Sequence, residues 1–576
     1  MYTDIKKLSN SLDNKNKREI YKIFFLILFG VFFETLSVGM VVPVVTLLVE
    51  DNLSTKFPIF NIILEYLGNP NKKELLKYLV LFFIFIFVIK NMFLTILIWK
   101  KNSFVYSISN YYSNKLFYKY ISKSYLFHVN KNSSELINNI DKETSLASGG
   151  FVYSLIDIVV ETLVFSSLFI LLLILEPVLT VLIFITFSAV GLLYYILFRK
   201  KILRFGYERQ IWNSAKIKSL NEILRNIKFY LILNKTNKVR KDFSNILDKI
   251  KNINIKYVFL NLLPRQLFEV VILITLCTII LIFASKDNYN LKDLVPTLAL
   301  LGVSAFRILP SMSKILQSFQ QLKYSRSAID VIYKELNNEK LNIESFDNNK
   351  NISFKNLLIE DLNFSYSNKD KPILKDLSLR IAKGKIYGFI GSSGSGKSTL
   401  LDIIMQLLDP ESGKIFLNDN LNFKEHKNWW HKSIGYVPQN IFLNDDSIKN
   451  NIALGEEESE IDEKRLKDAI NKSKLDDFIN NLEDGYNTNI GENGARLSGG
   501  QIQRIGIARA LYADPELLFL DEITSSLDLE TEAQIINDIQ YLKKNKTIVI
   551  ITHRSSTTKI CDEIYELKNL KLNKVK

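Results

Sequence analysis

The sequence has few of the residues that build small secreted proteins or metal centres. Its 576 residues include two cysteines, Cys277 and Cys561, and four histidines. Two cysteines exclude a disulfide-stapled fold and a cysteine zinc cluster, and four histidines leave little for a histidine metal site. Eleven prolines and 22 glycines, with 23% charged residues, exclude collagen-like and disordered classes. The length predicts two to four domains.

The chain is basic, and its charge is unevenly distributed. A net charge of +14 is compatible either with a nucleic-acid binder or with basic loops beside membrane helices. Residues 1–335 hold 42 Lys and Arg against 23 Asp and Glu, whereas residues 336–576 hold 32 against 37. The basic character therefore belongs to the first part, which also contains the long apolar runs.

Six apolar stretches in the first part are long enough to cross a membrane, which takes about 20 residues. They lie near 21–49, 76–99, 151–175, 178–198, 257–284 and 294–318. The loops 100–149 and 199–256 contain 7 and 16 Lys and Arg, and basic loops stay cytoplasmic. We therefore expect an α-helical transmembrane domain over 1–335, with both termini cytoplasmic and with helices 2 to 5 continuing past the membrane.

An external segment near 58–67 has the apolar spacing of a short amphipathic helix. It is either a cap packed on helices 1 and 2 or a surface helix that meets lipid or a lipid-linked substrate.

Several ionisable residues lie inside the expected spans, where each must face protein or a watery cavity. Lys90 and Arg307 are candidates for binding an anionic substrate such as a phosphate or pyrophosphate group, and Lys314 lies on the same helical face as Arg307. Arg265 and Glu269 are four residues apart and either pair with each other or meet a ligand. Glu34 and Glu161 also lie within spans.

Residues 336–351 form a polar linker, after which short apolar runs alternate with helical patterns, typical of an α/β domain over 352–576. A strand-like run to Ile390 leads into the phosphate-binding pattern G-x4-G-K-S and an apolar helix. Its backbone N–H groups can surround phosphates, Lys397 can neutralise them, and Ser398 can bind Mg²⁺. The predicted ATP-binding residues here are Gly391, Ser392, Ser393, Gly394, Ser395, Gly396, Lys397, Ser398 and Thr399.

Two further patterns accompany this loop. The run 517–522 predicts a buried strand that ends in Asp521, suited to the Mg²⁺ shell, and Glu522, suited to act as a general base. A second phosphate site is predicted where a helix begins after Leu497, Ser498, Gly499, Gly500 and Gln501. One domain does not need two such sites, but two chains arranged head to tail do.

Together these motifs resemble the ATP-binding cassette family over 352–570. The resemblance implies that Tyr366 stacks on adenine and that Gln439 touches Mg²⁺ or water. It implies a D-loop at 525–528 that includes Asp528, and a catalytic switch histidine at His553 near the γ-phosphate. It also implies ATP and Mg²⁺ as cofactors.

Six helices before one cassette resemble a type I exporter half-transporter. The membrane half looks most like bacterial flippases of lipid-linked oligosaccharides, in Phe33-Glu34-Thr35, Pro264-Arg265 and 306–310. That resemblance implies a homodimer in the bacterial inner membrane that flips a polyprenyl-diphosphate oligosaccharide, with Lys90, Arg265 and Arg307 near the pyrophosphate. A heterodimer stays possible. The alternatives are an exporter of another lipid, a peptide or a drug, and a non-transport ATPase, against which the apolar spans argue.

Overall fold

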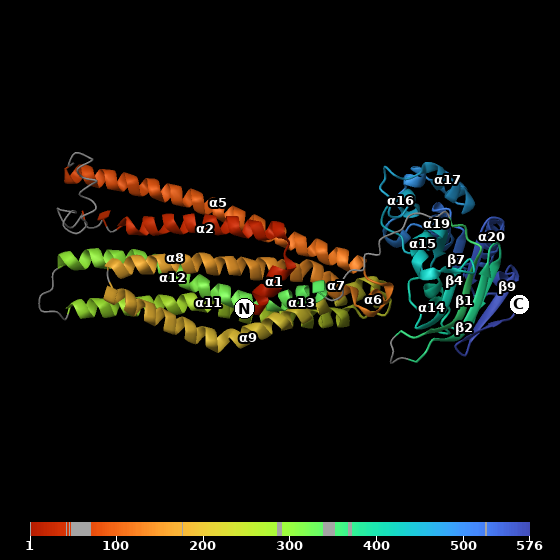
Figure 1. Ribbon diagram of the computed structural model, residues 1–576, viewed down its shortest axis with the longest axis horizontal. Helices are drawn as coiled ribbons and strands as arrows, with labels where there is room; N and C mark the ends of the chain where they lie inside the picture. Colours follow the sequence, from red (N-terminus) through yellow and green to blue (C-terminus); the bar gives the residue numbers. More distant parts are fainter. Residues whose placement is uncertain are drawn as a thin grey trace. The chain divides into compact units, whose positions relative to one another are not determined.

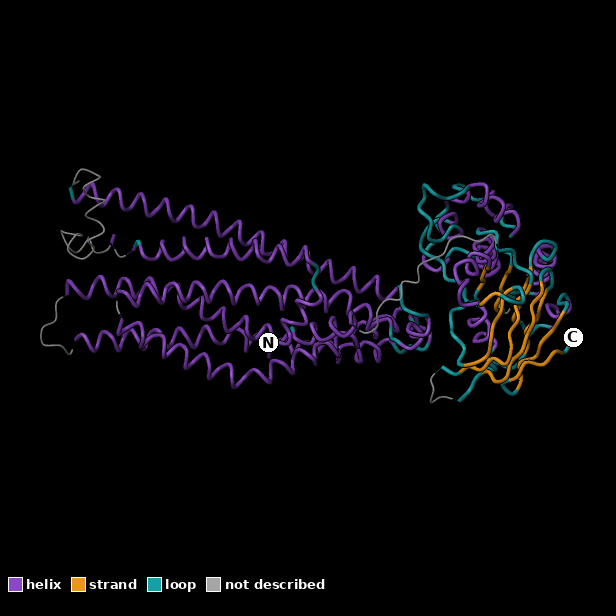
Figure 2. Tube along the Cα trace, in the orientation of Figure 1, coloured by secondary structure: helices purple, strands orange, loops and turns teal. Residues whose placement is uncertain are grey.

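The computed structural model describes residues 2–41, 43, 44, 47, 71–175, 177–284, 291–337, 352–366, 371–524 and 527–576. The chain forms two compact units, one of Met1–Lys123 with Lys131–Leu341 and the other of Ser124–Asn130 with Asn342–Lys576. All strands among the described residues belong to the second unit (Figure 2). The expected amphipathic segment 58–67 and most of the linker 336–351 lie outside the described residues.

The first unit is a bundle of long helices that run lengthwise beside one another (Figure 1). Its α-helices are α1 (Tyr2–Ser11), α2 (Asn14–Gly39), α5 (Lys72–Ile121), α7 (Ser133–Asn138), α8 (Tyr153–Leu175), α9 (Pro177–Arg225), α10 (Ile227–Ile232), α11 (Thr236–Ala284), α12 (Leu291–Tyr324) and α13 (Arg326–Asn337). Two π-helical stretches, Asn139–Glu143 and Leu146–Val152, join α7 to α8.

The helix boundaries follow local sequence signals. Asn71 and Glu74 form a capping box that begins α5. Pro177 begins α9, where its missing N–H costs no hydrogen bond. The helices α5, α9 and α11 have 50, 49 and 49 residues, about 75 Å each at 1.5 Å per residue, more than twice a bilayer core. This length accords with the expectation that they continue past the membrane.

Five helical segments of the described chain are long enough and apolar enough to cross a membrane: Asn14–Gly39, Lys72–Ile121, Ser133–Ile174, Thr180–Arg225 and Thr236–Thr275. Each of them overlaps one of the first five expected spans. The sixth, 294–318, lies on α12, part of which is outside the residues whose side chains the structure describes.

The second unit contains two β-sheets. A four-stranded antiparallel sheet has the order β2-β1-β4-β5, and a six-stranded sheet has the order β10-β9-β3-β8-β7-β6, parallel from β9 to β6. The strands are β1 (Asn356–Phe364), β2 (Leu374–Ala382), β3 (Ile386–Ile390), β4 (Ser412–Leu417), β5 (Leu421–Asn422), β6 (Ile434–Val437), β7 (Leu517–Asp521), β8 (Thr547–Ile551), β9 (Glu563–Lys568) and β10 (Lys571–Lys574). The helices are α14 (Lys397–Ile404), α15 (Lys427–Ser433), α16 (Ile448–Ile452), α17 (Glu463–Lys472), α18 (Asp476–Asn480), α19 (Gly499–Tyr512), α20 (Leu529–Leu542) and α21 (Ser555–Lys559).

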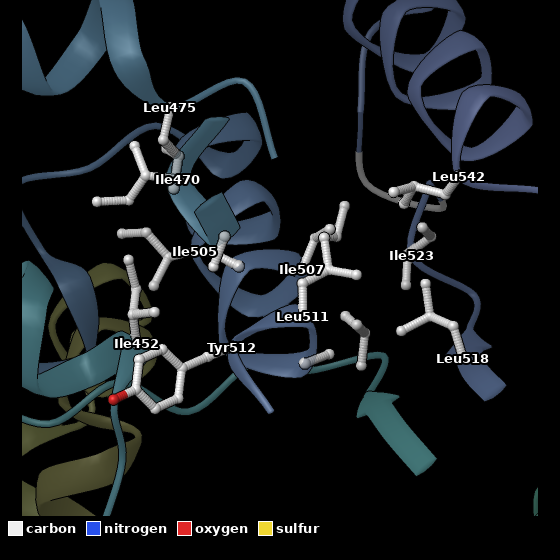
Figure 3. Close-up of a cluster of buried hydrophobic side chains, with 14 of the residues drawn as sticks. Ile452, Ile470, Leu475, Ile505, Ile507, Leu511, Tyr512, Leu518, Ile523 and Leu542 are labelled. Atoms are coloured by element: carbon white, nitrogen blue, oxygen red, sulfur yellow. The ribbon is translucent and has the colours of Figure 1, made fainter. Parts of the chain in front are cut away.

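Helix α19 connects the two sides of one hydrophobic core of this unit (Figure 3). Ile505 points toward Ile452 and Ile470, while Leu511 lies on the side of Leu518. All of these side chains are at most 5% exposed. The core holds α19 against the parallel sheet, and so fixes the start of that helix relative to the strand ends.

The short helix α6 (Tyr125–Asn130) lies between α5 and α7 in the sequence but groups with the second unit. Leu126 packs against the hydrophobic core around β1, β2 and α14. A division of the chain at residue 335 therefore misses one segment of the first loop, whose partly buried Leu126 packs against the core of the second unit.

Candidate functional site

The catalytic candidates meet at one edge of the six-stranded sheet. Strands β3, β6, β7 and β8 are parallel, so their carboxyl ends lie at the same edge. After these strands come the loop 391–398, Gln439, Glu522 and His553, respectively. Residues up to 162 positions apart in the sequence, from Gly391 to His553, are thereby brought to one edge of the sheet.

The loop 391–398 turns sharply between β3 and α14. Gly391 has φ +147°, and a Cβ there would lie 2.6 Å from the backbone oxygen of Leu567. Gly396 has φ +104° and precedes the first residue of α14. Side chains at these two positions would strain the backbone or collide, so glycine is required for this turn.

Two buried polar groups of the loop, Lys397 Nζ and Ser395 Oγ, are suited to bind phosphate. The Lys397 Nζ, buried with the residue 6% exposed, donates to the carbonyl oxygens of Gly391 and Ser392 at 2.8 and 3.0 Å. The buried Ser395 Oγ has no hydrogen-bond partner among the described residues. Burial lowers the pKa of Lys397, and the negative charges of Glu522 and Asp521 partly offset this lowering. A nucleotide phosphate would supply the acceptors that these donors lack.

The donor set beside the loop fits Mg²⁺. Asp521 is 8% exposed at the end of β7 and accepts a hydrogen bond from Ser398. Burial, and then the charge of Glu522, raises the pKa of Asp521. A carboxylate and a hydroxyl, with the amide oxygen of Gln439, are the oxygen ligands that Mg²⁺ prefers.

Glu522 is held by the other two candidates. Gln439 Nε2 donates to Glu522 Oε2 at 2.8 Å, and His553 Nε2 lies 3.1 Å from Glu522 Oε1. Glu522 itself has φ +47°, an unfavourable conformation for a glutamate, and strain of this kind is common at functional sites. The arrangement can orient a carboxylate as a general base.

Tyr366 and Thr399 lie at the border of the same loop. The Tyr366 hydroxyl is 3.2 Å from Thr399 Oγ1, and the ring meets Phe364 edge-on at 5.2 Å between centroids. The structure thus places the predicted adenine-stacking residue beside α14.

The second predicted phosphate site forms a separate cleft. Ser498 caps α19 and forms a capping box with Gln501. With Gly499 and Gly500 these residues line a cleft of about 740 Å³ that also includes Asp528, the cap of α20. No residue of the loop 391–398 lines this cleft.

Three of the four cations predicted in the membrane part, Lys90, Arg307 and Lys314, are joined by carboxylates in an unbroken series, which we call the ion-pair network. The members in order along the series are Lys90 (α5), Glu34 (α2), Arg307 (α12), Glu161 (α8), Lys314 (α12), Asp157 (α8) and Lys101 (α5). The N–O distances in that order are 3.6, 2.6, 3.8, 3.0, 3.7 and 2.6 Å.

Arg265 does not belong to the ion-pair network. It pairs with Glu269 on the same helix at 3.1 Å, and the two side chains are 63% and 44% exposed. Sequence reasoning missed Lys101 and Asp157, although Asp157 lies four residues before Glu161 and therefore on the same helical face.

Comparison with known proteins agrees with both units. The family model "ABC transporter" matches residues 374–525, and "ABC transporter transmembrane region" matches residues 19–306. The structure of a bacterial Atm1-family ABC exporter with ATP bound superposes with a TM-score of 0.76 at 19% identity, covering 97% of this chain and 95% of that one.

Among curated relatives, the chain is 42% identical over 214 residues to the ATP-dependent lipid A-core flippase of Wigglesworthia glossinidia brevipalpis. It is 41% identical over 212 residues to a putative multidrug export ATP-binding/permease protein of Staphylococcus aureus. Each match covers 37% of this chain and 36% of the relative, so the chain matches little more than a third of either relative's length.

The membrane-region match argues against a non-transport ATPase, and the expected fold, a helical membrane domain followed by an α/β cassette, is confirmed. The chain is a multi-pass membrane protein that belongs to the ATP-binding cassette transporter family, and its fold is that of an ABC exporter.

Proposed function

We propose that the chain uses ATP to flip a lipid-linked oligosaccharide of the polyprenyl-diphosphate type across the bacterial inner membrane, with both termini cytoplasmic. The observation that carries the substrate class is the presence of Arg307 and Lys314 inside the membrane part with side chains 26% and 43% exposed. A charged side chain within a membrane span costs free energy, so such residues usually serve a function. Cations that are also accessible can contact a substrate. An anionic headgroup is the ligand that suits them.

The residues at the carboxyl edge of the six-stranded sheet would bind and hydrolyse ATP. Lys397 and the loop N–H groups would hold the phosphates, and Ser398, Asp521 and Gln439 would hold Mg²⁺, which neutralises phosphate charge when bound. Glu522, oriented by Gln439 and His553, would accept a proton from the attacking water.

A second copy of the chain would complete the site. No residue of the loop 391–398 lines the cleft of Ser498 and Asp528, so a head-to-tail pair would place this cleft against the loop 391–398 of a partner. The apolar side chains of α10 also favour a dimer: Phe229, Leu231 and Ile232 are 64%, 62% and 69% exposed. Exposed apolar clusters of this kind mark interaction surfaces.

The proposed function is tested in proteoliposomes with a fluorescent polyprenyl-diphosphate oligosaccharide. We expect ATP-dependent movement between leaflets with the wild type and none with Glu522→Gln. Intact ATP hydrolysis without any movement of this lipid would contradict the proposed substrate.

Export of a drug, a peptide or another lipid is the second candidate, supported by the relatives described as a lipid A-core flippase and a putative multidrug exporter. ATP hydrolysis stimulated by apolar drugs, and unchanged in Lys90→Ala and Arg307→Ala, would favour this candidate.

A further inference from the structure

The carboxylates of the ion-pair network are more deeply buried than its outer cations. The side chains of Glu34, Asp157 and Glu161 are each 5% exposed. Among the cations, exposure rises from 6% at Lys101 and 11% at Lys90 to 26% at Arg307 and 43% at Lys314. A ligand can therefore reach Arg307 and Lys314, while the carboxylates contact these two cations from the protein side.

Glu161 is central to this arrangement. Its carboxylate accepts hydrogen bonds from Ser311 Oγ at 2.8 Å and Lys314 Nζ at 3.0 Å, and it lies 3.8 Å from the Arg307 guanidinium. All three partners lie on one face of α12. Glu34, on α2, approaches Arg307 from another helix at 2.6 Å. Both accessible cations are thus already neutralised in part by carboxylates of the chain.

Charge compensation of this kind changes which anions can bind. The ion-pair network contains four cationic and three anionic side chains, so one positive charge is in excess. A bilayer rich in anionic phospholipid offers a large excess of singly charged phosphodiesters. Unpaired cations would bind these lipids, whereas cations already paired with carboxylates release them more readily. Specificity then comes from weaker binding of the wrong ligand.

We propose that Glu161 and Glu34 are specificity-determining residues, internal counter-anions that let Arg307 and Lys314 prefer a diphosphate to a monophosphate. A diphosphate carries enough charge to compete with the carboxylates for both cations, while a single phosphate does not. The proposal rests on the proposed function for the identity of the site, and adds the means by which membrane phospholipids are rejected.

The test compares two lipids that differ only in phosphate number. Binding of undecaprenyl diphosphate and undecaprenyl monophosphate to the purified full-length protein is measured in phosphatidylcholine nanodiscs without ATP. We expect wild type to prefer the diphosphate by about tenfold or more, the order of one close charge pair. In Glu161→Gln the monophosphate should bind about tenfold more tightly and the preference should shrink toward one.

Controls separate this effect from general damage. Glu19→Gln removes a carboxylate from the same helix as Glu34, in an exposed pair with Lys22 at 2.7 Å, and should leave the preference unchanged. Glu34→Gln should act like Glu161→Gln, and it serves as the test if Glu161→Gln does not fold. Arg307→Gln should weaken binding of both lipids.

The results distinguish this inference from the proposed function. An unchanged preference in both glutamate variants, or weaker binding of both lipids, overturns the inference even if wild type flips oligosaccharide. A preference that shrinks as expected supports it even if no oligosaccharide is moved. If neither lipid binds wild type or either glutamate variant, both the inference and the proposed substrate fall.

Discussion

The two charged centres of this protein are built in opposite ways. At the carboxyl edge of the six-stranded sheet, Lys397 Nζ donates to two main-chain carbonyl oxygens of its own loop, and Ser395 Oγ has no partner among the described residues. In the ion-pair network, every cation lies within 4 Å of a carboxylate from another helix. The first centre is left incomplete for a ligand, whereas the second is largely satisfied by the protein itself. A ligand adds partners at the first but has to compete with existing ones at the second.

The largest expected effect concerns the general base of the cassette. Glu522→Gln keeps the hydrogen-bonding shape but cannot accept a proton, so ATP hydrolysis should fall by about 10²–10⁴-fold while ATP binding persists. Phosphate release and nucleotide binding are measured on the same protein. Glu463→Gln, exposed on α17, is the matched control. Hydrolysis close to wild type in Glu522→Gln would mean that another group is the base.

The incomplete cassette site should be completed in trans. Lys397→Ala and Ser498→Arg should each abolish hydrolysis as single-variant preparations. When the two are reconstituted together, a mixed head-to-tail pair contains one intact site, and hydrolysis should return to about a quarter of wild type at most. Activity is measured against the mixing ratio. Absence of any recovery would argue that the two sites do not combine between chains.

Burial should decide how much an ion pair matters to stability. Asp157→Asn leaves Lys101 buried without its carboxylate at 2.6 Å, at a cost of about 3–5 kcal/mol in the free energy of unfolding. Asp248→Asn breaks a pair with Lys251 at the same 2.6 Å, but those side chains are 53% and 60% exposed, so the effect should be small. Thermal unfolding in detergent measures both. Equal shifts in Tm in the two variants would show that burial does not decide how much these ion pairs contribute to stability.

The smallest expected effect comes from Asp402, a half-buried carboxylate of the cassette that lies near another carboxylate. Burial, and then the charge of Asp521, raises the pKa of Asp402 to about 6. The folded state therefore holds this proton more tightly than the unfolded chain, and stability falls as pH rises from about 4 to about 6. Asp402→Asn should raise Tm relative to wild type at about pH 7.5 and much less at about pH 4. A Tm difference that does not depend on pH would contradict the raised pKa.

Prediction from sequence succeeded where the chemistry is local. The loop 391–398, the strand that ends in Asp521 and Glu522, and the capped start of α19 each occupy a few consecutive residues, because phosphate binding needs adjacent N–H groups. The first five apolar spans were likewise predictable, because a helix that crosses a bilayer needs about 20 apolar residues along its own length. The site roles given to individual residues remain predictions.

The features that could not be predicted from the sequence depend on contacts between segments that are distant along the chain. Lys90, Arg307 and Lys314 could be recognised as unusual charges in spans, but nothing in their sequence neighbourhood indicates that Glu34, Asp157 and Glu161 compensate them. The same holds for Leu126, which is partly buried against the cassette core in the segment that groups with the second unit.

The sequence by itself determined the membrane and cassette architecture and the residue types at the ATP site, because periodicity and short motifs act over one helix or one loop. Only the tertiary structure decided which charges meet. Pairing between α2, α5, α8 and α12 depends on how the helices pack, and Glu522 reaches Gln439 and His553 only through the order of parallel strands. Packing therefore separated Arg265, exposed beside Glu269, from the cations of the ion-pair network.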